Sequence, residues 1–127
     1  MPWKVVPLAP FVRSAKSHEK SWHAEMRAAV ANAYDLVQQL DQGTKPAQLS
    51  LLGYVHSGYP LGILAVDETG HGQKKRPKAL RLYVYPSEEQ QLLYLLLIGG
   101  KDGQSADVAK CKSAVEELLA RQPPESL

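Results

Sequence analysis

The chain has 127 residues, of which 44% are hydrophobic and 22% are charged, and its formal net charge at pH 7 is +2. This length suits one domain with one hydrophobic core, and the composition excludes a chain that is disordered throughout. The small basic excess permits binding to a polyanion but is below that of most dedicated nucleic-acid-binding proteins.

The single cysteine, Cys111, cannot form an intramolecular disulfide and supplies no set of zinc ligands. It falls in an apolar helical pattern, so we expect it in the core rather than in a catalytic site. The first eleven residues contain no apolar run long enough for a signal peptide, and the longest apolar stretch, residues 92–98, is too short to span a bilayer. We therefore expect a cytoplasmic protein.

Residues 3–8 form a short segment that is rich in apolar side chains. Pro7 and Pro10 disfavour the interior of a helix there. We predict a strand at the edge of a sheet, where proline is tolerated.

The strongest periodic segment comes next and predicts a long amphipathic helix. It starts near Ser17 or Ser21 and stops at Gly43. Apolar side chains recur there at steps of three and four on one helical face, at Trp22, Met26, Ala29, Val30, Ala33, Val37 and Leu40.

The middle of the chain alternates apolar and polar segments. Residues 49–55 and 59–66 are apolar and are separated by turn-forming residues, so we expect at least the second to be a strand. Residues 67–78 are polar and contain two glycines, a proline and a basic run, which predicts a solvated loop.

Two strong strand signals follow. Residues 80–85, LRLYVY, alternate and combine aromatic with β-branched side chains. After a turn at residues 86–90, residues 91–98, QLLYLLLI, predict a fully buried strand at the centre of the sheet. Together they predict an antiparallel hairpin that ends at Gly99 and Gly100.

A last helix is predicted after these glycines, with Ser105 as its N-cap and Asp107 at the positive end of its dipole. Residues 122–127, with two prolines, are expected to form a flexible tail. The apolar stripe of this helix consists of Val108, Cys111, Val115, Leu118 and Leu119.

The order of these elements predicts an α+β fold in a single domain, residues 1–127. We expect a four-stranded antiparallel or mixed sheet, with an N-terminal helical segment and a C-terminal helix packed on it.

The hairpin and the residues after it resemble the C-terminal half of toxins of the RelE/HigB/ParE superfamily, among them HigB-like, phage-derived killer proteins. Members of the family show a strand of the type R-V-Y-F, an apolar strand, and then G-G-D-K-S-x-Q-x-x-D-I-x-x-A. Here residues 80–85 are followed by an apolar strand and by residues 99–110, GGKDGQSADVAK, which are one residue shorter after the glycines. Gln104, Asp107 and Val108 keep their places relative to the helix, and the element order agrees with the family's β-α-β-β-β plan.

The resemblance implies the toxin of a toxin–antitoxin pair, which cuts messenger RNA at the ribosome without a metal or other cofactor. A cognate antitoxin neutralises such a toxin, and the assembly is a toxin–antitoxin complex or a homodimer. In the reaction a 2′-hydroxyl attacks the adjacent phosphate, which needs a base, donors for the phosphorane oxygens and an acid.

Two other readings stay open. One is a RelE-fold protein without RNase activity, either a gyrase-targeting ParE-like toxin or a degenerate binding module. It is favoured because residues 60–67, PLGILAVD, lack the basic residue of the family's E-L-R stretch, and because the segment after them is longer than usual. The other is an unrelated small α+β interaction module, which would lack a neighbouring gene for a helix-turn-helix antitoxin.

The catalytic candidates that the resemblance implies are Arg81, Lys101 and Tyr83. Arg81 matches the family's active-site arginine, and a guanidinium fork suits phosphate oxygens. Lys101 lies in the matched glycine loop, and Tyr83 shares a strand face with Tyr85, from which a ring can stack on a base. The competing interpretations are a surface arginine, a turn lysine and a core tyrosine.

A basic run precedes this strand and can neutralise RNA phosphates, although such runs also occur in ordinary solvated loops. The RNA-binding candidates are its four cations, Lys74, Lys75, Arg76 and Lys78.

The four histidines, His18, His23, His56 and His71, form no pair at metal-ligand spacing, so we predict no metal site. His56 and His71 fall in predicted loops near the cleft. A histidine there can act as an acid or base, or can simply lie on the surface.

Overall fold

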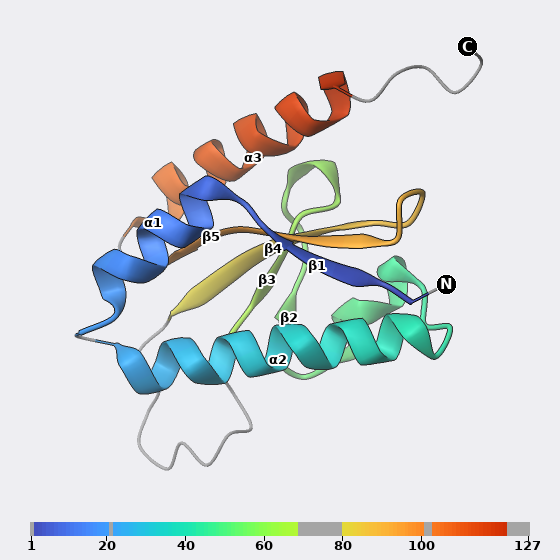
Figure 1. Ribbon diagram of the computed structural model, residues 1–127, viewed down its shortest axis with the longest axis horizontal. Coiled ribbons are helices and arrows are strands. Elements are labelled where there is room, and N and C mark those ends of the chain that lie inside the picture. The colour runs from blue at the N-terminus through green and yellow to red at the C-terminus, as the bar shows by residue number, and fades with distance from the viewer. Residues whose placement is uncertain (1, 21, 69–79, 101–102, 122–127) are drawn as a thin grey trace.

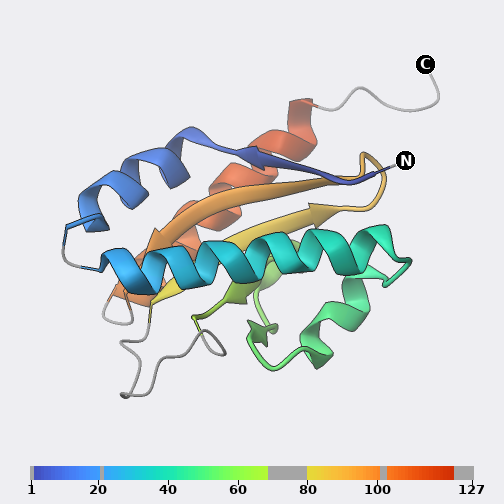
Figure 2. The same cartoon turned by 60° about the horizontal axis from the view of Figure 1, so that its bottom comes forward.

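The structure is a computed structural model that describes residues 2–20, 22–68, 80–100 and 103–121. A sheet runs through the middle of the molecule, with α3 on one side and α2 on the other (Figures 1 and 2). In chain order the elements are β1 (Lys4–Pro7), α1 (Ala9–His18), α2 (His23–Asp41), the 3-10 helix η1 (Pro46–Leu51), β2 (Val55–His56), the 3-10 helix η2 (Pro60–Gly62), β3 (Leu64–Val66), β4 (Arg81–Ser87), β5 (Leu92–Gly99) and α3 (Gln104–Arg121).

The sheet is mixed and has five strands in the order β1-β5-β4-β3-β2 among the described residues. β1 pairs with β5 in parallel, and the other pairs are antiparallel. The expected α+β class is therefore confirmed, but the expected count of four strands is wrong. The additional strand, β2, has only two residues, which is too short for the alternation that reveals a strand in a sequence.

The predicted central hairpin is confirmed. β4 and β5 pair along their whole length, and all of β5 except Leu92 is buried, as its apolar sequence requires. β1 lies at the edge of the sheet, as the prolines predict. Residues 59–66, expected as one strand, divide into η2 and β3, because Leu61 and Gly62 adopt positive φ angles of 60° and 82°.

Helix α1 was not expected, because Pro10 argues against a helix. In the structure Pro10 lies in the first turn of α1, where the missing N–H has no intrahelical partner to lose. α1 packs along β5 past the end of β1. There the backbone N–H of Ile98 donates to Oγ of Ser14 at 3.0 Å, and the Ser14 hydroxyl donates to the carbonyl of Pro10 at 2.8 Å. α1 thus completes the hydrogen bonding of the central strand.

Alternation along β4 divides the core between the two faces of the sheet. Leu82 and Val84 pack in one cluster with the buried side of α2, whereas Tyr83 packs in the other cluster with α3. We call these the α2 face and the α3 face. The buried side chains of α3 are Cys111 and Val115, so the expectation that Cys111 belongs to the core is confirmed.

The two long helices differ from the prediction only near their ends. α2 ends before Gly43, whose φ of 103° is a conformation that favours glycine. Ser105 lies inside α3 rather than capping it, and Leu119 is 42% exposed, so the apolar stripe ends earlier than expected. No helix in the part of the chain that the structure describes is long and apolar enough to cross a membrane. The tail, residues 122–127, lies outside that part.

We expect Ser14→Ala to lower the free energy of unfolding by about 1–2 kcal/mol, because the N–H of Ile98 loses its acceptor. Urea denaturation followed by circular dichroism measures this loss. Ser17→Ala, on the exposed side of α1, is the control and should change stability by less than about 0.5 kcal/mol. Equal effects of the two substitutions would contradict the role of Ser14.

Candidate functional site

Four residues form a row across one end of the sheet. Arg81, the first residue of β4, is paired with Gly99, the last residue of β5. Continuing the β3–β4 register by one residue brings Asp67 opposite Arg81. The backbone N–H of Asp67 donates to the carbonyl of Tyr54 at 2.9 Å, which extends the row by one more residue. We call Tyr54, Asp67, Arg81 and Gly99 the sheet-end row.

Arg81 is a half-buried cation, and one of its hydrogen-bond donors has no partner among the described residues. Its side chain belongs to the α3 face, because Leu82 points to the α2 face. Its Nε is buried and has no hydrogen-bond partner among the described residues. Arg81 also forms no ion pair with another described residue. A buried donor without a partner is costly. The side chain as a whole is only half-buried, and a guanidinium fork suits an oxyanion.

Glu68 follows the sheet-end row and is a buried carboxyl group, only 1% exposed. Its Oε2 has no hydrogen-bond partner within the described ranges. Burial raises the pKa of Glu68, repulsion from Asp67 and Glu25 raises it further, and Arg81 and its own backbone N–H act in the opposite direction. The neutral form of this carboxyl group is therefore favoured beside Arg81.

A second carboxyl group reaches the same end of the sheet from α3. Asp107 lies so close to Gly99 that a Cβ at position 99 would collide with its carboxylate. The next residue, Gly100, packs against the ring of Trp22, which would lie 3.3 Å from an added Cβ. Burial raises the pKa of Asp107, with Lys110 and His18 opposing the shift. The two glycines are thus needed for close packing at the end of β5.

Tyr83 lies in the core, next to Arg81 in sequence. Its side chain is fully buried and meets Tyr59 edge to face, with ring centroids 5.7 Å apart. Burial raises the pKa of Tyr83, and the charges of both Asp107 and Arg81 act on it. The ring therefore packs in the core of the α3 face, as the core-packing interpretation of this residue describes.

The remaining predicted site residues cannot be compared with this geometry. Lys101, Lys74, Lys75, Arg76 and Lys78 all lie outside the described residues.

The structure brings together one pair that the sequence did not predict. Nε2 of His56 lies 2.7 Å from Oδ2 of Asp67. His56 on β2 is paired with Ala65, and Asp67 directly follows β3, so the two residues are diagonal neighbours. The sequence held one indication of this pair, because a turn at residues 56–58 brings the following segment back alongside His56. The turn alone does not determine the strand register, so it could not show that Asp67 is the residue that contacts His56.

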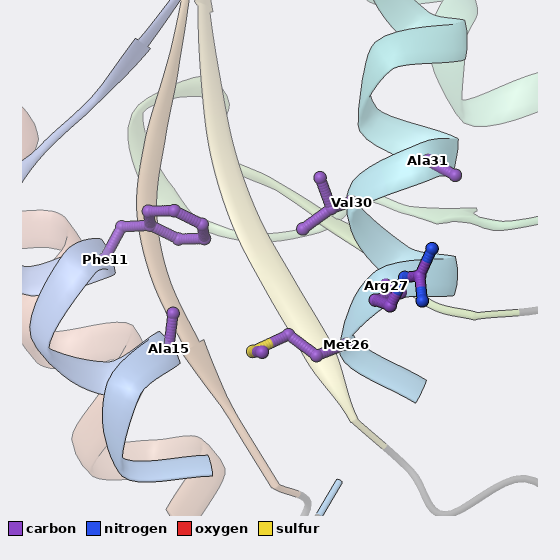
Figure 3. Close-up of a pocket in the computed structure, with 6 residues that line it drawn as sticks. All are labelled: Phe11, Ala15, Met26, Arg27, Val30 and Ala31. Atoms are coloured by element: carbon purple, nitrogen blue, oxygen red, sulfur yellow. The ribbon is translucent and has the colours of Figure 1, made fainter. Parts of the chain in front are cut away.

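An apolar groove lies on the α2 face between α1 and α2, which diverge from their connection (Figures 2 and 3). Its volume is about 310 Å³. Val12 of α1 and Tyr34 of α2 are 49% and 54% exposed, and helical geometry puts both on its rim. The lining residues are Phe11, Ala15, Met26, Arg27, Val30 and Ala31.

No protein-family model, curated protein or solved structure matches this chain. Within the described residues, no three His, Cys, Asp or Glu side chains are grouped so that they could hold a metal ion. The ionisable groups that the structure brings to this part of the sheet are Arg81, Asp67, Glu68, Asp107 and His56.

We expect Glu68→Gln to stabilise the protein at neutral pH by more than the roughly 0.5 kcal/mol typical of surface changes. Because burial raises the pKa of Glu68, the carboxyl group favours folding while it is protonated and opposes folding as rising pH ionises it. The advantage of the variant should therefore vanish below about pH 4, where the carboxyl group is also protonated in the unfolded chain.

Denaturant unfolding at neutral and acid pH measures this difference. Glu116→Gln, at an exposed position of α3, is the matched control and should show no such pH dependence. A gain for Glu68→Gln that persisted unchanged at acid pH would contradict the electrostatic cause.

Proposed function

We propose that this chain is the toxin of a toxin–antitoxin pair of the RelE/HigB type, and that it cleaves messenger RNA at the ribosome. The observation that carries the proposal is Arg81, a half-buried cation at the end of the sheet whose Nε has no hydrogen-bond partner among the described residues. Its sequence position is that of the family's active-site arginine. The order of elements, a strand, two helices, antiparallel strands and a C-terminal helix, also supports the family's plan.

Arg81 suits the electrostatic part of this reaction. Attack of a 2′-hydroxyl on the neighbouring phosphate builds negative charge on the phosphorane oxygens, and fixed cationic donors stabilise that charge. A guanidinium does so without a metal ion. Burial raises the pKa of Glu68, so its carboxyl group competes less with an anion for Arg81 than a solvent-exposed carboxyl group would. A cytoplasmic location is part of the proposal, and the free Cys111 fits a reducing compartment.

The alternative is a RelE-fold toxin without RNase activity, such as a gyrase-targeting ParE-like protein. Two observations favour it. The buried ring of Tyr83 is not available to stack on a base, and three carboxyl groups, those of Asp67, Glu68 and Asp107, lie around the same end of the sheet. Carboxylates reduce the attraction of a site for phosphate.

The partner in this proposal is an antitoxin that lays an amphipathic helix into the groove between α1 and α2. The walls of the groove are apolar, as helix-in-groove recognition requires. Arg27 on its edge forms no ion pair with any described residue, so it is free to pair with an acidic side chain of the partner. Val12 and Tyr34 offer apolar area on the two rims.

We expect induction of the wild-type chain in a bacterial host to stop growth and to create new messenger RNA ends. Arg81→Ala should abolish both effects, and so should Lys101→Ala if the matched loop takes part. Arg13→Ala, on an exposed part of α1, is the control and should act as wild type. Growth arrest without new RNA ends would favour the ParE-like alternative, and an inert wild-type chain would contradict a toxin.

We expect Arg27→Glu and Ala31→Tyr to weaken neutralisation by the protein that the adjacent gene encodes, while growth arrest by the toxin itself persists. The first change reverses the charge at the rim, and the second fills the groove. Each should raise the dissociation constant about tenfold or more. Lys112→Glu, on the exposed side of α3, is the control. Unchanged affinity of both groove variants would exclude this groove as the antitoxin site.

A further inference from the structure

His56 lies at the edge of the sheet with its side chain 36% exposed, on the same face as Arg81. It is paired with Ala65, which belongs to the cluster on the α3 face. Asp67 contacts His56 and therefore also projects on this face, opposite Arg81 in the register. A histidine, the carboxylate that holds it and a guanidinium thus follow one another across three neighbouring strands.

Asp67 is fixed at three points. Its N–H donates to the carbonyl of Tyr54 at 2.9 Å, and its own carbonyl accepts from Nδ2 of Asn32 at 2.8 Å. Asn32 is buried in α2. The third contact is made by the carboxylate of Asp67, which accepts a hydrogen bond from Nε2 of His56. The imidazole is therefore oriented by a residue whose own backbone is held by two hydrogen bonds.

We propose that His56 is the general base of the RNA cleavage, that Asp67 is its positioning residue, and that Arg81 binds the phosphate under attack. This inference rests on the function proposed above. The pairing with Asp67 leaves Nδ1 of His56 as the nitrogen that accepts a proton, since Nε2–H donates to the carboxylate.

The step balances with water as the only further reactant. The 2′-hydroxyl of the RNA loses its proton to Nδ1 of His56 while the 2′ oxygen bonds to phosphorus. The bond from phosphorus to the 5′ oxygen breaks, and that oxygen takes a proton from water. The hydroxide that remains removes the proton from the imidazolium, which regenerates the base. The products are a 2′,3′-cyclic phosphate and a 5′-hydroxyl.

The charges around His56 suit this role. The carboxylate of Asp67 stabilises the imidazolium that forms in the step. Arg81 lies on the next strand but one, and Glu68 follows Asp67 in the chain. On the α2 side, Asp35 accepts a hydrogen bond from the hydroxyl of Tyr54. Among the described residues, His56 thus contacts the carboxylate of Asp67, and Arg81 lies across the sheet from it.

The test is single-turnover cleavage of a defined messenger RNA on ribosomes by the purified full chain, between about pH 5 and pH 8. We expect His56→Gln to lower the rate about 100-fold or more and to abolish the fall in rate at acid pH. Asp67→Asn should lower the rate about tenfold or more, because its amide no longer selects the reactive form of the ring. His23→Gln, at an exposed position of α2, is the matched control.

The outcomes separate this inference from the proposed function. Cleavage by His56→Gln at the wild-type rate would overturn the role of His56 and leave the function standing. A loss that is equal at every pH, with the acid limb kept, would reveal a structural role and would also overturn it. A wild-type chain that leaves RNA intact would overturn both. Circular dichroism of each variant identifies unfolding, and Asp67→Asn then supplies the decisive pH profile.

Discussion

The fold depends on one constraint: the backbone N–H and carbonyl groups of β5 are buried in the core and must all form hydrogen bonds. β4 satisfies one edge of this strand, and β1 satisfies the other only as far as Leu95. Beyond that point the partners come from the start of α1. The N–H of its N-cap residue, Leu8, donates to the carbonyl of Leu95 at 3.0 Å, and Oγ of Ser14 accepts from the N–H of Ile98. A buried amide without a partner would cost as much as a lost hydrogen bond. This requirement explains why a helix follows β1 at once.

The same arrangement determines what gathers at the end of the sheet. Because β4 begins where β3 and β5 end, antiparallel pairing collects Asp67, Arg81 and Gly99 from distant parts of the chain. α3 starts at this end as well and adds Asp107. Among the described residues Arg81 therefore lies near several carboxyl groups, of which Glu68 is the most buried. Burial raises the pKa of Glu68, and the nearby charge of Arg81 opposes that shift.

The sequence predicts those parts of the fold that repeat a pattern over many residues. The apolar run of β5 and the helical stripes of α2 and α3 extend over several turns or alternations, so they could be recognised. Helix α1 has ten residues with Pro10 near its start, and β2 has two, so neither carries enough pattern. The pair of His56 and Asp67 depends on a cross-strand register, which tertiary packing sets. Arg81 was predicted from the resemblance and Glu68 was not, because the sequence alone does not distinguish a buried carboxyl group at the end of a strand from one on the surface.

The groove lies on the α2 face and the side chain of Arg81 on the α3 face, and Trp22 packs at the end of the sheet that holds Arg81. Trp22 packs with the core of the α2 face, to which the walls of the groove also belong. Its ring also packs on Gly100, next to the residue paired with Arg81. Trp22 therefore joins the core of the α2 face to Gly100, directly after β5. The close packing of this face thus extends to the strand end beside Arg81.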